Sequence, residues 1–238
     1  WKLLLNMKLK FVKESGSLVQ STNEKEKATI LGIIPRYAAL PLLIVVAWNM
    51  CVYFGNRIFS SNLYHYDFTT SLDEKIPLIP WTIVIYLGCY LFWIINYILS
   101  CRDNREKALR FTSADVIGKT VCLLFYVFLP TTNVRPEIVG NDVFSQMMNW
   151  LYGTDAADNL LPSIHCFVSW MCFIGVRNSP KVPSWWKEAS FAIAIAICVS
   201  TLTTKQHILI DVFSGVLLAE ICYALADKFP VLTKIPLI

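Results

Sequence analysis

The pattern of apolar and polar positions divides the chain into long apolar stretches separated by short polar segments. The first two stretches, residues 37–55 and 76–101, carry no charged side chain. Four further stretches follow, each interrupted or bounded by a few ionisable groups: residues 116–134, 159–176, 189–204 and 206–226. A helix needs roughly 20 predominantly apolar residues to cross a bilayer. The pattern therefore predicts an all-α, polytopic membrane protein with six transmembrane helices.

The composition supports this class. Hydrophobic residues make up 55% of the 238 positions and charged residues only 16%, whereas soluble domains carry roughly 25% charged residues. We expect a lead-in at residues 1–36, a membrane domain at residues 37–228 and a short tail at residues 229–238. The basic residues of the lead-in are interpreted as contacts with lipid headgroups rather than as a nucleic-acid site. No cleavable signal peptide is evident, so the first span is expected to act as the insertion signal.

The distribution of basic residues predicts the orientation of the spans. When the six spans alternate direction, 17 of the 21 Lys and Arg residues fall on one side and four on the other. Basic residues concentrate in cytoplasmic loops. Both termini are therefore predicted to be cytoplasmic, and the loops at residues 56–75 and 135–162 are predicted to face the extracytoplasmic side.

Eight cysteines lie in or at the ends of the apolar stretches without CxxC spacing. This placement favours packing over disulfides or a metal site. No cofactor is expected.

Two of the three histidines stand at the starts of predicted spans, at the extracytoplasmic face. His165 follows a Pro-Ser pair at the start of the fourth span, and His207 opens the sixth. Asp211 lies four residues after His207, so the two side chains would share one face of a helix. A carboxylate inside a membrane helix costs about 2.5 to 3.5 kcal/mol and normally faces a partner or a cavity. The spacing therefore predicts a His207–Asp211 pair with His165 nearby.

This set of residues is suited to nucleophilic catalysis. Asp211 would fix the tautomer of His207 and stabilise positive charge on its ring. His165 would act as general acid and then as general base. Arg135 and Lys205 supply cations for an anion with several oxygens, and Ser163 could cap the fourth helix beside that anion. The chemistry is that of phosphoryl transfer through a phosphohistidine.

Three short motifs support this interpretation. The segment LPSIH at residues 161–165 resembles a PSxH motif, and residues 200–211 resemble an SRxxxxxHxxxD motif. Arg135 and Pro136 resemble the end of a KxxxxxxRP motif. In order, spacing and membrane side, the three are similar to the motifs of the type 2 phosphatidic acid phosphatase superfamily, over roughly residues 76–226.

The resemblance implies a six-helix core, no required metal, His207 as nucleophile, His165 as general acid, Asp211 as orienting residue and Arg135 as phosphate ligand. Two positions depart from the motifs: Phe128 stands where the superfamily has Lys, and Thr201 where it has Arg. This weakened set is similar to the branch with inositol phosphorylceramide and sphingomyelin synthases, which pass a substituted phosphate to an alcohol. Lys205 is the nearest substitute cation.

Several residues also have structural interpretations. The His207–Asp211 pair could be a packing pair, Arg135 an interfacial anchor, and Lys205 a solvated helix-end residue. His65 is expected in an exposed loop, Lys119 is expected to snorkel to the interface, and Glu220 to make a hydrogen bond between helices. The amphipathic segment at residues 141–153 is expected to lie on the outer interface.

Three functions remain open from the sequence. The first is a lipid phosphatase that hydrolyses phosphate monoesters at the extracytoplasmic face. The second is transfer of a lipid headgroup phosphate to an alcohol. The third is a non-catalytic carrier of anionic lipids, and the sequence makes no prediction of the oligomeric state.

Overall fold

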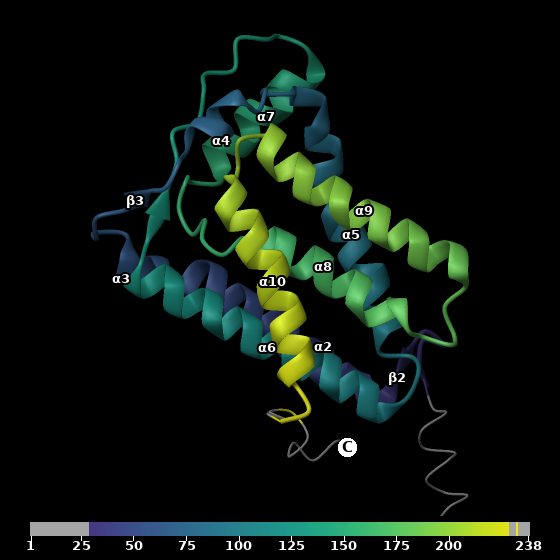
Figure 1. The fold of residues 1–238 in the computed structure, drawn as a ribbon. Coiled ribbons are helices and arrows are strands. Elements are labelled where there is room, and N and C mark those ends of the chain that lie inside the picture. The colour runs from purple at the N-terminus through teal and green to yellow at the C-terminus, as the bar shows by residue number, and fades with distance from the viewer. Residues whose placement is uncertain (1–28, 229–231, 233–238) are drawn as a thin grey trace, which may run out of the picture.

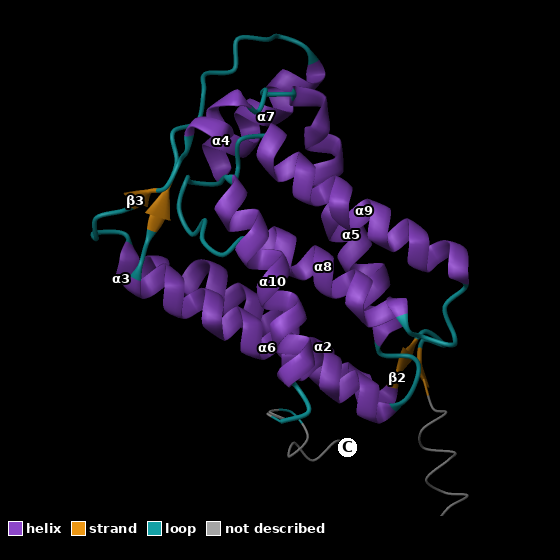
Figure 2. Cartoon of the chain, in the orientation of Figure 1, coloured by secondary structure: helices purple, strands orange, loops and turns teal. Residues whose placement is uncertain are grey.

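The computed structural model describes residues 29–228 and Leu232, and within that part the chain is mostly helical (Figures 1 and 2). Most of the expected lead-in and tail, residues 1–28, 229–231 and 233–238, lies outside the described residues. The helices are α2 (Arg36–Gly55), α3 (Arg57–Ser60), α4 (Ser71–Lys75), the 3-10 turn η1 (Pro80–Thr82), α5 (Ile83–Ser100), α6 (Arg105–Phe128), α7 (Val143–Thr154), α8 (Ile164–Arg177), α9 (Ser184–Thr203) and α10 (Leu209–Leu225).

Four two-residue strands join loops rather than building a sheet layer. Strands β1 (Thr29–Ile30) and β2 (Ile34–Pro35) pair antiparallel just before α2. Strands β3 (Tyr66–Asp67) and β4 (Thr131–Thr132) pair in parallel and connect the segment after α3 with the segment after α6.

Helix α8 lies at the centre of the bundle. It packs against α5, α9, α10 and α6, while α2 packs along the outer side of α6 (Figure 1). The short helices α4 and α7 and strand β3 gather at one end, and β2 and the last turns of α10 lie at the other (Figure 1). The α9–α10 turn and the start of α8 face the end that carries α4 and α7. The predicted site residues therefore lie toward the end of the bundle that carries α4 and α7.

Four of the described helical segments are long and apolar enough to cross a membrane: Arg36–Ser60, Pro80–Ser100, Arg105–Phe128 and Ser184–Thr203. They support the prediction of a membrane protein. Helix α8 has 14 residues and α10 has 17, so at 1.5 Å per residue they are about 21 and 26 Å long. Both are shorter than the hydrocarbon core of about 30 Å.

The helix boundaries differ from the apolar stretches for local reasons. Helix α6 begins eleven residues before the predicted start at residue 116, because Asn104 caps it by accepting from the Lys107 N–H at 2.8 Å. It ends at Phe128, just before Pro130, since the residue ahead of a proline avoids helical backbone angles. Helix α8 begins only after Pro162, with Ser163 as its cap.

The predicted snorkelling of Lys119 is wrong. Its side chain is buried within the bundle, and its ammonium lies 2.8 Å from the Asp115 carboxylate one turn earlier in α6. The Tyr97 hydroxyl of α5 donates to the same carboxylate. The pair satisfies the ammonium locally, so the side chain has no need to reach the interface.

Other polar contacts between helices agree with the sequence. Glu220 of α10 accepts from the Trp170 indole at 2.9 Å and pairs with the Arg177 guanidinium at 2.6 Å, both on α8. The predicted interhelical hydrogen bond of Glu220 is confirmed. Seven of the eight cysteines are buried among apolar side chains, as expected of packing residues. Most of the segment at residues 141–153 lies in α7 (Val143–Thr154), which Asp142 caps. Its location on the outer interface stays a prediction.

Candidate active site

The turn between α9 and α10 positions His207. The Gln206 N–H donates to the Thr201 carbonyl at 3.0 Å and the Lys205 N–H to the Leu202 carbonyl at 3.1 Å. Lys205 itself has φ = 54°, in the left-handed region. These bonds and this backbone angle make a Schellman ending for α9. The His207 N–H joins them by donating to the same Thr201 carbonyl at 3.1 Å, so the turn is fixed through His207.

The Lys205 side chain holds this turn against the segment at residues 73–76. Its ammonium donates to the carbonyls of Asp73 at 2.9 Å and Ile76 at 2.5 Å. A non-glycine residue in the left-handed region is strained, and these two bonds help to retain it. The Lys205 ammonium therefore fixes the α9–α10 turn in place through these two hydrogen bonds. Its predicted contact with a phosphate stays a prediction.

Asp73 completes the attachment of α4 to the start of α10. Its carboxylate accepts from the Leu209 N–H at 2.7 Å and from the Thr70 N–H at 2.9 Å. Burial alone would raise the pKa of Asp73, but hydrogen bonds from Thr70 and Leu209 and the charge of Lys205 hold it below its ordinary value. Asp73 therefore stays ionised as a fixed acceptor.

Asp211 and His207 pair as predicted, although not on a shared helical face. His207 precedes α10, and Asp211 is the third residue of that helix. The Asp211 carboxylate turns back to accept from the Ile208 N–H at 3.0 Å and lies 3.3 Å from Nδ1 of His207. This capping arrangement places the carboxylate on Nδ1. Within the described chain Nε2 of His207 has no hydrogen-bond partner, and it is the atom available for chemistry.

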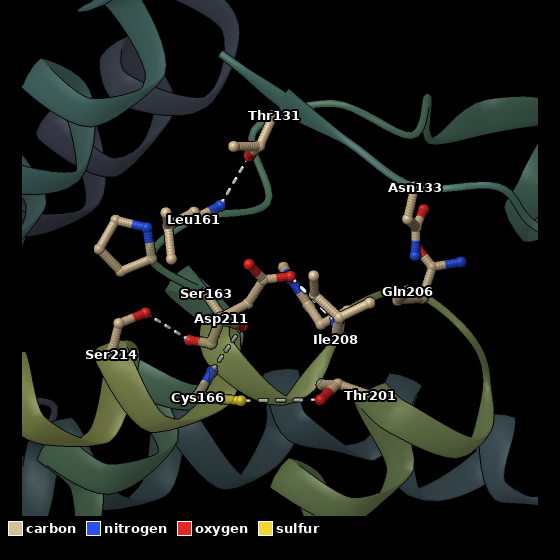
Figure 3. Close-up of polar contacts among 12 residues, drawn as sticks. Thr131, Asn133, Leu161, Ser163, Cys166, Thr201, Gln206, Ile208, Asp211 and Ser214 are labelled. Atoms are coloured by element: carbon tan, nitrogen blue, oxygen red, sulfur yellow. Dashed lines mark hydrogen bonds and ion pairs between the residues drawn. The ribbon is translucent and has the colours of Figure 1, made fainter. Parts of the chain in front are cut away.

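Ser163 is the cap of α8, as predicted. Its Oγ accepts from the Cys166 N–H at 3.3 Å, and its own N–H donates to the Asp211 carbonyl at 3.0 Å. Figure 3 shows Ser163, Asp211 and Cys166 gathered at this junction. Gly215 permits the close approach of the two helices, because a Cβ there would lie 2.6 Å from the Ser163 carbonyl oxygen. The start of α8 is thus fixed directly to the first turn of α10.

This junction brings the two predicted catalytic histidines together. The ring centroids of His165 and His207 are 6.0 Å apart. Nε2 of His165 is buried, and no group in the described residues bonds to it. A group placed between the rings could contact both of them, which is the geometry that a nucleophile and a general acid require.

Three aromatic side chains of α5 surround the His165 ring. Tyr86 stacks on it with centroids 4.7 Å apart, while Trp93 and Tyr90 lie at 5.4 and 6.4 Å. Trp93 is itself held by a hydrogen bond of 2.9 Å to Ser169 of α8. These contacts could not be predicted from the sequence, because they depend on the rotation of α5 against α8.

Arg135 reaches the same cavity from the segment after β4. Its guanidinium donates to the carbonyl of Asp155 at 2.5 Å and to Oε1 of Gln206 at 2.8 Å, and it lies over the Tyr152 ring at 5.0 Å. Burial raises the pKa of Tyr152 to about 12 even though the Arg135 charge lowers it, so the phenol stays neutral. Arg135 is therefore held in the wall of the cavity by Gln206, the residue that precedes His207.

A narrow cavity of about 20 Å³ lies between these groups. Its lining residues are Tyr53, Tyr126, Arg135, Asp155, Asp158, Asn159, Leu160, Ile164, His165, Gln206 and His207. The Arg57 guanidinium holds its acidic wall, with contacts of 3.5 Å to Asp155 and 2.8 Å to Asp158. The structure thus brings His165, His207 and Arg135 to one cavity, with Ser163 and Asp211 directly behind it.

A larger groove of about 430 Å³ lies on another side of His207. Lys205, Asn133 and the segment around Asp73 line it together with His207. A substituent on a phosphate in the narrow cavity would have room there.

The two motif positions that depart from the superfamily have other surroundings. Phe128 is exposed at the end of α6. Thr201 is buried in α9, where its hydroxyl donates to the Cys198 carbonyl at 2.7 Å and contacts the Cys166 sulfur at 3.7 Å (Figure 3). Neither residue supplies a cation to the cavity.

The sequence did not single out Gln206 and Asn159 as site residues, although both line the cavity. Gln206 is adjacent to the predicted nucleophile, which was the one available signal. Asn159 lies in a loop at φ = 58°, and nothing in its spacing relates it to the histidines.

None of the known family models, curated proteins or solved structures that were compared with this chain matches it. The activity is therefore inferred from the residues of the chain itself.

Proposed function

We propose that the chain is an integral membrane lipid phosphatase with a six-helix bundle, acting on phosphate monoesters at the extracytoplasmic face. The observation that carries this proposal is the His165–His207 pair, with ring centroids 6.0 Å apart and Asp211 against the far nitrogen of His207. The resemblance to the type 2 phosphatidic acid phosphatase superfamily supports the same assignment of roles.

The first step forms a phosphohistidine. Nε2 of His207 attacks phosphorus while the bond between phosphorus and the lipid oxygen breaks, and His165 donates a proton to that leaving oxygen. Asp211 accepts from Nδ1 of His207 and stabilises the positive charge that develops on the ring. Arg135 attracts the phosphate to the cavity.

The second step returns the enzyme to its initial state. His165, now neutral, removes a proton from water as the water oxygen attacks phosphorus. The bond between phosphorus and His207 breaks, and phosphate leaves. General acid and base assistance by one residue typically contributes 10²- to 10⁴-fold.

A second candidate function uses an alcohol in place of water and transfers a lipid headgroup phosphate. The groove of about 430 Å³ beside His207 favours it, because a phosphodiester keeps a substituent on phosphorus that the narrow cavity would not hold. The absence of cations from Phe128 and Thr201 also fits a substrate with less charge.

The proposal is tested by measuring inorganic phosphate released from phosphatidic acid by the detergent-purified protein. We expect release by the parent, inhibition by vanadate, and a loss of at least 10³-fold in His207→Ala. A labelled headgroup that moves to a new lipid without free phosphate would select the second function. Full activity in His207→Ala would overturn both, and binding without any turnover by the parent would support the carrier.

A further inference from the structure

The cavity between the two histidines contains side-chain amide nitrogens without a partner. Nε2 of Gln206 and Nδ2 of Asn159 are buried, and neither makes a hydrogen bond within the described part of the chain. Gln206 is 2% exposed and Asn159 is 7% exposed, and both line the cavity. Buried donors are nearly always paired in folded proteins. Two unpaired donors at one cavity therefore indicate a ligand with acceptor oxygens.

The orientation of the Gln206 amide is fixed by its neighbour. Its Oε1 accepts from Nη2 of Arg135 at 2.8 Å. A guanidinium has donors only, so the amide oxygen must face it and the amide nitrogen must face away. Figure 3 shows Gln206 on the α9–α10 turn, close to Asn133. The side-chain N–H groups of Gln206 thus have no partner in the described residues, and Gln206 lines the same cavity as His165 and His207.

The charged groups around the cavity offset one another. Arg135 is a cation in its wall, and Arg57 is a cation bound to the acidic wall. Asp155 and Asp158 are the two carboxylates of that wall, so two positive and two negative charges sum to zero. Asp211 adds one negative charge behind His207. Arg57 forms the ion pairs with both carboxylates, so Arg135 is the one guanidinium among these groups without a carboxylate partner in the described residues. The charge of a protonated His165 is offset by that of Asp211. One negative charge on a bound phosphate is therefore matched by Arg135, and a second negative charge finds no further cation among these groups.

We propose that Gln206 and Asn159 donate to the non-bridging oxygens of the phosphate, and that the site selects a phosphate with a single negative charge. Such a phosphate is a lipid phosphodiester or the monoanion of a lipid phosphate monoester. Neutral amide donors satisfy the phosphate oxygens but add no charge, in contrast to lysine or arginine at the same place. This selectivity rests on the proposed function, because it concerns the same cavity.

Two lipids with one diacylglycerol part separate these charge states. Phosphatidylmethanol is a diester with one negative charge at any pH used. Phosphatidic acid gains its second charge on ionisation with a pKa near 6. We expect the parent to release diacylglycerol from phosphatidylmethanol, with methyl phosphate as the transferred group. The general acid and base steps are common to both lipids, so their pH dependence cancels in a ratio of the two kcat/KM values. We therefore expect kcat/KM for phosphatidic acid, divided by kcat/KM for phosphatidylmethanol, to fall between pH 5.5 and pH 8.

Gln206→Lys tests the role of the neutral donor. The quantity compared is kcat/KM for the diester divided by kcat/KM for the monoester. At pH 8 we expect this ratio to be lower in the variant than in the parent by about tenfold or more. The matched control is Gln146→Lys, which adds the same charge at an exposed position of α7, on the same predicted side. The control should keep the parental ratio. A ratio that is the same in Gln206→Lys, Gln146→Lys and the parent would overturn the inference.

Gln206→Glu keeps the test valid if the lysine variant does not fold. It preserves the size of the side chain, and the new carboxylate can pair with Arg135. At pH 8 we expect vanadate to inhibit Gln206→Glu at least tenfold more weakly than the parent, with part of the loss recovered at low pH as the carboxylate gains a proton. Vanadate inhibition equal to that of the parent at pH 8 would overturn the inference.

The two proposals fail separately. If turnover proceeds without phosphate bound to His207, the proposed function is wrong. If the phosphohistidine forms but Gln206→Lys leaves the diester-to-monoester ratio of kcat/KM unchanged, only the charge selectivity is wrong.

Discussion

At the residue scale, Asp73 shows how a carboxylate outside the cavity fixes the reacting histidine. It accepts from the Leu209 N–H at the start of α10, and its carbonyl accepts from the ammonium of Lys205. Leu209 and Lys205 stand on either side of His207 in the chain. The position of His207 therefore depends on Asp73, although Asp73 has no role in the chemical steps.

Substitution of Asp73 is expected to destabilise this end of the bundle. The pKa of Asp73 is lowered in the folded protein, so its contribution is complete above the unfolded pKa near 4 and is lost as the pH falls through the folded pKa. We expect Asp73→Asn to lower the free energy of unfolding at pH 7 by about 1 to 2 kcal/mol. We also expect the variant to lose less stability than the parent on acidification below about pH 4.

The thermal unfolding midpoint in detergent at pH 7 and pH 3.5 measures both effects. Glu137→Gln is the control, because Glu137 is exposed and makes no polar contact in the described residues. Identical acid sensitivity in Asp73→Asn and the parent would contradict this role.

The sequence predicted the site residues that act through local spacing. Asp211 follows His207 by four residues, and Ser163 stands directly before α8, so both contacts were accessible from the sequence. The distance between His165 and His207 could not be predicted from the sequence, because it depends on how closely α8 approaches α10 at Gly215. Gln206 and Asn159 were missed since a partnerless amide is visible only once its surroundings are known.

At the element scale, α6 carries a buried ion pair against α5. The Lys119 ammonium lies 2.8 Å from the Asp115 carboxylate, and Tyr97 donates to that carboxylate. Removing one member leaves the other charged and buried, which costs about 3 to 5 kcal/mol. Replacing both members with apolar residues is often nearly neutral.

We therefore expect Asp115→Leu to lower the thermal unfolding midpoint strongly. The double variant Asp115→Leu with Lys119→Met should regain most of the loss, because no unpaired ammonium remains. Both midpoints are measured in the same detergent. A double variant as unstable as the single variant would show that the pair contributes more than mutual neutralisation.

Apolar stretches predicted the existence of the long helices better than their ends. Residues 105–115 are helical although they include several charges, because Asn104 caps the helix and tertiary contacts bury one of its faces. Residues 206–208 belong to the predicted apolar stretch at residues 206–226 but are not helical. The N–H groups of Gln206 and His207 bond to Thr201 at the end of α9, and that of Ile208 bonds to the Asp211 carboxylate. Caps and turns, rather than hydropathy, set these boundaries.

At the scale of the whole molecule, the bias of basic residues predicts that α7 and the cavity face the extracytoplasmic side. Val139 is 88% exposed in the loop before α7, and Trp185 is exposed at the start of α9, on the predicted cytoplasmic side. In a Cys51→Ser background, a membrane-impermeant maleimide should label Val139→Cys in intact cells. It should label Trp185→Cys only after permeabilisation. Labelling of Trp185→Cys in intact cells would contradict the orientation.

The fold and the site also agree at this scale. The four long apolar segments support a membrane protein, and β2 and the last turns of α10 lie at the end of the bundle opposite the cavity (Figure 1). An even number of spans would place both chain ends on one side, as the six-helix proposal requires. The short α8 and α10 would then meet at the cavity end, where the histidines need access to water.

The central claim is that His207 takes the phosphoryl group covalently. The most direct measurement incubates the protein with ³²P-labelled phosphatidic acid, quenches it in base and locates the labelled peptide by mass spectrometry. We predict a label on His207 that is stable in base and lost in acid, and no label in His207→Ala. Turnover by the parent with no phosphate on His207, or an unchanged label in His207→Ala, would contradict the mechanism.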